Sequence, residues 1–118
     1  HVGYNQFYEL DTQWANLQTL QELNMEHNRL QKIPNSIGLL KQLKTLILND
    51  NNLKEMPPSF SALENLELAI LSGNKLEDLP EEISALKKLR TLILTNNKFG
   101  KVEQERIKAA LPRCRIYF

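Results

Sequence analysis

Apolar residues recur along this chain at a fixed step of 23 residues. In segment 43–65, LKTLILNDNNLKEMPPSFSALEN, apolar residues occupy positions 1, 4, 6, 11, 14, 18 and 21, while asparagine occupies position 9 and proline position 15. Segments 20–42 and 66–88 place residues of the same character at the same positions. A sequence repeat of this period predicts a stacked array, in which each unit buries its apolar face against its neighbours.

The repeat predicts a single domain over residues 1–118 and divides it into units. These are a partial repeat 1–19, full repeats 20–42, 43–65 and 66–88, a last repeat with a helix 89–110, and a cap strand 111–118. The chain opens inside a repeat and starts with His1 rather than methionine. We therefore expect that an N-terminal segment is missing and that the chain is a fragment of a larger protein. The alternative is an irregular start that serves as an imperfect cap.

Within each unit, the alternation of residues at positions 4 to 6 predicts a short strand. In unit 43–65 it directs Leu46 and Leu48 inward and Ile47 outward. The second half of the unit contains the proline and predicts a short helical or 3-10 segment, because the missing N–H of proline is harmless in a first helical turn. Apolar residues at positions 18 and 21 then follow helical spacing. The chain is thus expected to run along a strand and to return on the opposite side.

The asparagine at position 9 is expected to turn the chain after each strand. A buried amide can donate to and accept from backbone groups of adjacent coils that would otherwise lack partners. The alternative is a surface row of amides that binds a ligand, but a period locked to the leucines favours the structural role. The predicted asparagine ladder consists of Asn5, Asn28, Asn51, Asn74 and Asn97.

The C-terminal end departs from the repeat. A longer helical stretch near residues 103–111 replaces the proline-led return, with Ile107, Ala110 and Leu111 facing inward. Pro112 ends this helix. The tail then resumes the strand pattern. The register predicted for it puts Arg113 at position 3, Arg115 at position 5 beside Ile93, and Tyr117 at position 7. We interpret its basic residues as a solvated cap over the last coil, and phosphate binding is the alternative.

Phased leucines, the asparagines and the LP, IP and MP dipeptides resemble leucine-rich repeats of the 23-residue type, LxxLxLxxNxLxxLPxxIxxLxxL. The resemblance covers essentially the entire chain, and the closing helix with LPRCRIYF is similar to the ending of bacterial members. The resemblance implies an α/β fold, a short curved right-handed solenoid. A parallel sheet would line its concave face and short helical or 3-10 segments its convex face. It also implies a protein-binding surface.

Composition changes this picture little. With 42% apolar and 25% charged residues, the chain has ordinary globular composition, and its net charge of +1 gives no reason to expect a nucleic-acid partner. No apolar run approaches the roughly 20 residues of a membrane span, and no signal peptide is visible, so a cytoplasmic and a secreted location both stay open. Charge is uneven, because residues 1–88 carry eight bases and twelve acids, whereas residues 89–118 carry seven bases and two acids.

Side chains suited to catalysis are few. Cys114 is the single cysteine, which excludes an intrachain disulfide, and we expect it to be a buried apolar thiol. His27 is expected to be a solvated residue beside the Asn28 turn, and no phosphate-binding glycine loop is present. An enzyme acting through Cys114 or His27 is the disfavoured alternative. We predict a non-enzymatic protein with no cofactor and no metal.

The outward positions of the strands carry the candidate site. Position 5 gives Ile47, Ile70 and Ile93 in consecutive strands ~4.8 Å apart, and Leu68 lies beside them. An exposed apolar patch with a polar rim is typical of an interaction surface, although β-branched residues also simply favour strands. The predicted partner-binding residues are Glu22, Asn24, Glu26, Thr45, Ile47, Asn49, Asp50, Leu68, Ile70, Ser72, Arg90, Ile93 and Arg115.

The charges that flank this patch have opposite signs at its two ends. Acidic Glu22, Glu26, Asp50 and Glu67 lie toward the start, and Arg90, Arg113 and Arg115 toward the end. We predict a protein–protein interaction module that binds a partner, of unknown identity, on its concave sheet face. The alternative is a recognition or regulatory segment of a larger multidomain signalling or cell-surface protein. Either a monomer or weak self-association is compatible with the sequence.

Overall fold

The structure is a computed structural model and describes residues 19–118. Asn5 and nearly all of the predicted partial repeat 1–19 lie outside the described residues. In chain order the elements are β1 (Glu22–Asn24), η2 (Asn35–Leu39), β2 (Thr45–Ile47), η3 (Pro58–Ala62), β3 (Leu68–Ile70), η4 (Glu81–Ala85), β4 (Thr91–Ile93), α1 (Lys101–Ala110) and β5 (Arg115–Tyr117), where η marks a 3-10 helix.

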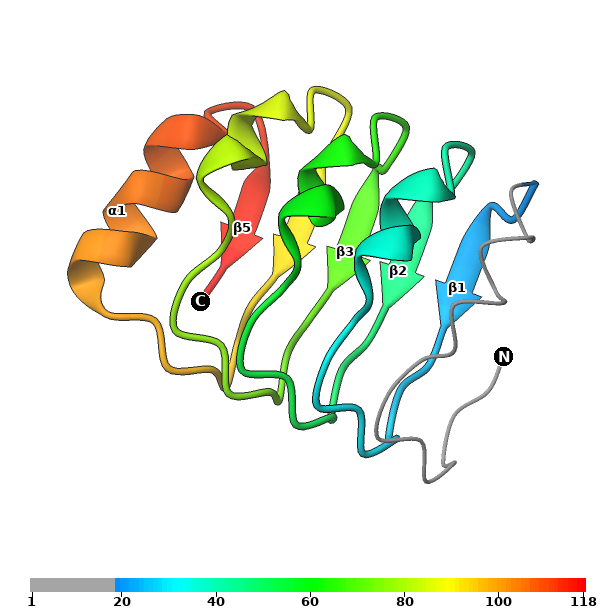
Figure 1. The fold of residues 1–118 in the computed structure, drawn as a ribbon. Helices are drawn as coiled ribbons and strands as arrows, with labels where there is room; N and C mark the ends of the chain where they lie inside the picture. The colour runs from blue at the N-terminus through cyan, green and yellow to red at the C-terminus, as the bar shows by residue number, and fades with distance from the viewer. Residues whose placement is uncertain (1–18) are drawn as a thin grey trace.

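The strands form one parallel sheet in the order β1-β2-β3-β4-β5 (Figure 1). From β1 to β4 each residue pairs with the residue one repeat later, so Leu23 lies opposite Leu46, and Ala69 opposite Leu92. Each strand has three residues, at repeat positions 3 to 5 in β1 to β4, and the buried residue at position 6, such as Leu48, continues the inward alternation beyond the strand. The predicted parallel sheet with short helical returns is confirmed.

The 3-10 helices η2, η3 and η4 lie side by side on the other side of the sheet (Figure 1). Each follows a proline, namely Pro34, Pro57 and Pro80. The proline carbonyl closes the first turn by accepting the N–H three residues later, as from Ile37 to Pro34 at 3.1 Å. Five-residue helices are too short to be stable alone, so their stability comes from packing.

The core fills the space between the sheet and the returns. Leu46 and Leu71 from the strand side and Phe60 and Ile83 from the return side are all fully buried. Each such side chain stabilises the fold by about 1.5–3 kcal/mol relative to exposure. At Gly38 the returns approach so closely that an added Cβ would lie 2.9 Å from the Cβ of Ser59 in η3.

The last return is the helix α1, which begins two residues earlier than the predicted residue 103 and ends one residue before the predicted 111. Gly100 accepts the first helical bond, from the Gln104 N–H at 3.0 Å, so the helix can start at Lys101. Leu111 leaves the helical region, with a φ of −128°, because it precedes Pro112. Ile107 is fully buried and Leu111 is 6% exposed, as their inward positions predict.

Candidate partner-binding surface

The outward side chains of β1 to β5 form the surface that we call the concave face. Strand register places the position-5 residues in one row, with Asn24 opposite Ile47, Ile47 opposite Ile70, and Ile70 opposite Ile93. The position-3 residues form a second row, in which Thr45 lies opposite Leu68. Leu68 and Ile70 point to the same side of β3 because side chains alternate along a strand.

The end of both rows differs from the sequence prediction. Arg115 pairs with Thr91, in the position-3 row, and Tyr117 pairs with Ile93, in the position-5 row. The prediction that Arg115 lies beside Ile93 is therefore wrong by two residues, because the return through α1 is longer than the register assumed. Arg113 precedes β5 and is not part of a strand row.

Tyr117 lies on the concave face although it was not among the residues predicted for the site. Its side chain is 49% exposed, and it continues the isoleucine row to the edge strand. Ile47, Leu68, Ile70 and Ile93 are instead only partly exposed. In a sheet, the side chains of adjacent strands cover one another, whereas a residue on the edge strand has such a neighbour on one side only.

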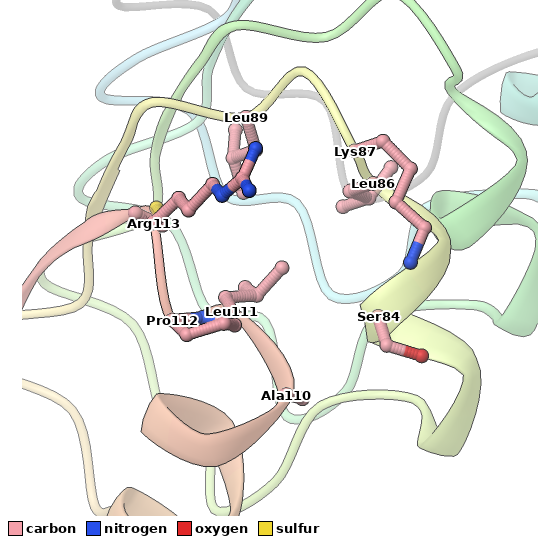
Figure 2. Close-up of a pocket in the computed structure, with 9 residues that line it drawn as sticks. Ser84, Leu86, Lys87, Leu89, Ala110, Leu111, Pro112 and Arg113 are labelled. Carbon is pink, nitrogen blue, oxygen red and sulfur yellow. The ribbon is translucent and has the colours of Figure 1, made fainter.

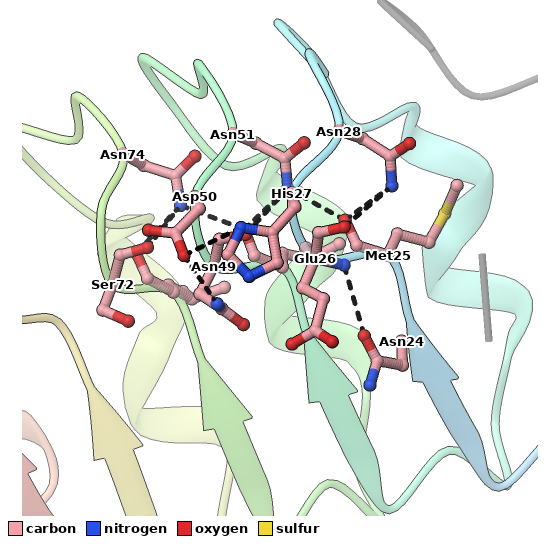
Figure 3. A network of polar contacts seen from close by, with 12 residues as sticks. Asn24, Met25, Glu26, His27, Asn28, Asn49, Asp50, Asn51, Ser72 and Asn74 are labelled. Carbon is pink, nitrogen blue, oxygen red and sulfur yellow. Dashed lines mark hydrogen bonds and ion pairs between the residues drawn. The ribbon is translucent and has the colours of Figure 1, made fainter. Parts of the chain in front are cut away.

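A polar network lies at the carboxyl ends of β1 and β2 (Figure 3). The Asp50 carboxylate contacts the His27 ring, with 3.2 Å between Oδ2 and Nδ1, and the same oxygen accepts a 3.0 Å hydrogen bond from the Asn49 amide. Asn24 is turned toward its own backbone, where its Oδ1 accepts the Glu26 N–H at 3.2 Å. Asp50 thus joins two neighbouring repeats, and its side chain is still 48% exposed.

The turn that follows each of the strands β1 to β4 needs a residue in the left-handed backbone conformation, with a positive φ, at repeat position 8. The φ angles are 57° at His27, 61° at Asp50, 68° at Gly73 and 57° at Asn96. Asp and Asn tolerate this conformation, and glycine adopts it without steric cost. Gly73 also makes room for its neighbour, because a Cβ there would clash with the Asp50 carboxylate. The sequence pattern Asp, Gly, Asn at one repeat position was the available signal for this turn.

The position-9 asparagines lie directly beneath these turns. The Asn51 amide donates to the carbonyls of Met25 at 3.0 Å and Leu48 at 2.8 Å, and its oxygen accepts the Leu30 N–H at 3.2 Å. Asn74 and Asn97 make the same set of bonds one and two repeats later. Asn28 donates to Met25 at 2.9 Å. These bonds fix the turns that carry Glu26, Asn49 and Ser72 at the rim.

Acidic side chains predominate at the β1 and β2 end of the concave face, where Lys44 is the exception, and basic side chains predominate at the β4 and β5 end. Glu22, Glu26 and Asp50 lie on or just after β1 and β2, whereas Arg90 precedes β4 and Arg115 lies on β5. The side chains of Glu22, Asp50, Arg90 and Arg115 are all exposed, while Glu26 is partly exposed. The surface can therefore offer an apolar centre between an acidic end and a basic end.

Of the two residues considered for catalysis, His27 belongs to the polar network described above and Cys114 lies elsewhere. Cys114 is half-buried beside α1 rather than on the concave face, and burial raises the pKa of its thiol to about 11. Its thiol is therefore protonated at neutral pH, which makes it a poor nucleophile. Within residues 19–118, no group of three His, Cys, Asp or Glu side chains is arranged to hold a metal ion.

The repeat spacing is also a family signature. A model of the leucine rich repeat family matches residues 1–53 and 41–99. The chain belongs to the leucine-rich repeat family. Leucine-rich repeat domains are generally non-enzymatic and typically mediate protein–protein interactions, for which solenoids provide extended concave surfaces. In the described part of this leucine-rich repeat domain, no helix is both long and apolar enough to cross a bilayer.

Solved leucine-rich repeat structures share this fold over 97% of the chain. A leucine-rich repeat protein of Leptospira interrogans is 38% identical with a TM-score of 0.94, and the chain covers 29% of its length. The leucine-rich repeat ectodomain of a receptor kinase from Arabidopsis thaliana is 30% identical with a TM-score of 0.74, and 65% of it is covered.

An internalin of Listeria monocytogenes is 24% identical with a TM-score of 0.81, and this likeness shows the fold alone. The chain covers 32% of the internalin, so it spans only about a third of each of these two bacterial chains. A search of curated proteins found no match.

Proposed function

We propose that this leucine-rich repeat domain is a non-enzymatic module that binds a protein partner on its concave face. The observation that carries the proposal is the row of Ile47, Ile70 and Ile93, which strand register places side by side. Leu68 widens the row on β3, and Tyr117 extends it to the edge strand. Core packing does not require this row, because the inward residues Leu46, Ala69 and Leu92 already fill the interior.

The arrangement has the anatomy of a specific interface, with an apolar centre and a polar rim. Tyr117 supplies an exposed aromatic side chain, a type enriched among residues that dominate binding energy. The partner we infer presents an apolar anchor to Ile70, basic groups toward β1 and acidic groups toward β5. These charges would orient the partner and speed its association more than they would raise affinity.

A capture experiment tests the proposal in two steps. The wild-type domain and a variant with Ile47, Ile70 and Ile93 each changed to Glu are used to retain proteins from a lysate. Val102→Glu is the matched control, because Val102 lies on α1, away from the sheet, and is 86% exposed. We expect one or more proteins that the wild type and the Val102 variant retain and the triple variant loses. Identical retention by all three folded proteins would contradict the proposal.

A second candidate function is recognition or regulation within a larger multidomain signalling or cell-surface protein. It is favoured by the solved structures, in which the chain matches 29% and 32% of longer bacterial chains. The same concave face would then select the partner on which the larger protein acts. Introducing Ile70→Glu into the full-length gene product discriminates the two functions. The second predicts that an activity located outside residues 1–118 loses its response to the partner, whereas the first predicts loss of binding alone.

A further inference from the structure

A pocket of about 340 Å³ opens where the repeat pattern ends (Figure 2). It lies between η4 with the segment after it and the loop that connects α1 to β5. Leu86, Leu89 and Leu111 provide apolar walls, and Cys114 also lines it. The pocket is separate from the concave face, so a ligand bound in it would be independent of the proposed function.

The pocket exists because α1 does not follow the path of a 3-10 return. At repeat position 19, Gly38 and Ser61 are buried, and Gly38 lies against η3 of the next repeat. Ser84 occupies the same repeat position, but it is exposed because α1 leaves it uncovered. Behind Ser84, Leu86 and Leu89 line the pocket and are 1% and 4% exposed, whereas the equivalent Leu63 and Leu66 of the preceding repeat are fully buried.

Two cationic side chains flank the pocket, Lys87 from one side and Arg113 from the other (Figure 2). Lys41 occupies the repeat position of Lys87, and its ammonium donates to the Ala62 carbonyl of the next return at 3.1 Å. Lys87 has no such return beside it. Neither it nor Arg113 forms an ion pair with an acidic side chain of residues 19–118. No acidic residue lines the pocket.

We propose that this pocket binds a small amphipathic anion, a free carboxylate that carries a short apolar chain. The chain would lie against Leu86, Leu89 and Leu111, where it replaces water on an apolar surface. The carboxylate would accept hydrogen bonds from Lys87 and from the planar guanidinium of Arg113, which suits a carboxylate geometrically. The pocket volume lies at the lower end of the range of small-molecule sites, about 300–1,000 Å³, which favours a small ligand.

Cys114 provides a direct readout of occupancy, because it is one of the residues that line the pocket. We would measure its alkylation by iodoacetamide, a neutral reagent, at one fixed pH with increasing millimolar n-octanoate. Octanoate should slow the alkylation in a saturable way, while n-octylamine at equal concentration should have less effect. Changing both Lys87 and Arg113 to Gln should weaken the protection by about tenfold, because two charge-assisted hydrogen bonds are lost. Lys41→Gln removes one positive charge at the repeat position of Lys87 but outside the pocket, and should leave the protection unchanged.

The backbone amide NMR shifts of the same samples locate the bound octanoate. We expect octanoate to shift the signals of Leu86, Leu89 and Leu111 most, with the same dissociation constant as the protection of Cys114. The proposal would be overturned by octanoate protecting no better than octylamine. It would also be overturned by equal protection in the Lys87/Arg113 variant, or by the largest shifts lying on the concave face. All substituted residues are exposed, so we expect the variants to fold. Far-UV circular dichroism checks that they do.

Discussion

Asn51 joins its own repeat to the preceding one through hydrogen bonds to Met25, Leu48 and Leu30. Its amide is only 6% exposed, so water cannot replace these bonds. Asn51→Ala would leave two buried carbonyls and one N–H with fewer partners, and we expect it to lower the free energy of unfolding by about 3 kcal/mol. Urea denaturation measures this loss.

Asn52→Ala is the matched control, because the Asn52 side chain is partly exposed and only its backbone bonds to the neighbouring repeat. We expect it to cost less than about 1 kcal/mol. Equal losses in the two variants would show that the position-9 amide does not hold the coils together.

The reactivity of Cys114 depends on its pKa of about 11, which burial raises. Only the thiolate is alkylated, so the rate should increase about tenfold per pH unit through neutral and mildly basic pH. It should level off only near pH 11. Iodoacetamide labelling of the folded protein, with urea-unfolded protein as the reference, measures this dependence. A rate that levels off near pH 8.5, the usual range of a free thiol, would contradict the assigned burial.

At the scale of elements, α1 is fastened to the return of the preceding repeat. Glu103 accepts the Leu79 N–H at 3.0 Å, and Arg106 donates to the Leu79 carbonyl at 2.6 Å while it pairs with Glu103. The hydrogen bond from Arg106 lowers the pKa of Glu103 below its ordinary 4.5, against the opposing effect of burial. A lowered folded-state pKa contributes stability above pH 4.5, and this contribution is lost as the pH falls through the folded-state value.

Glu103→Gln is therefore expected to lower the free energy of unfolding by about 1 kcal/mol at neutral pH. The difference from wild type should shrink below pH 4.5, where the carboxylate of the wild type becomes protonated. Glu105→Gln is the control, because Glu105 is 64% exposed and its Lys108 partner lies 4.0 Å away. It should change stability by less than about 0.5 kcal/mol at any pH. A difference between Glu103→Gln and wild type that stays constant down to about pH 3 would contradict this anchor.

The repeat step predicted the register of β1 to β4, because each proline-led return has the same length. The repeat step could not predict the register of β5, because the number of residues in the return through α1 is not set by the repeat. The pattern therefore put Arg115 beside Ile93, where the structure has Tyr117. The sequence pattern also could not show how much of the surface of Ile47 and Ile70 is covered by the side chain on the adjacent strand.

At the scale of the whole molecule, the sheet arranges an apolar row between acidic and basic ends. The identity of the row could be predicted from the sequence, because position 5 points outward in every strand. The pocket beside α1 could not, since it depends on which space the helix leaves unfilled. Partner binding on this row, and not on the convex side, is what we propose for the domain.

The most direct test is the affinity of the wild type, Ile70→Glu and Val102→Glu for one captured partner, measured by isothermal titration calorimetry. Ile70 lies in the middle of the row, between Ile47 and Ile93, so a charge there would be buried against the partner. We predict that Ile70→Glu raises the dissociation constant about 30-fold, or about 2 kcal/mol, while Val102→Glu changes it less than about twofold. A dissociation constant for folded Ile70→Glu equal to that of the wild type would contradict binding on the isoleucine row.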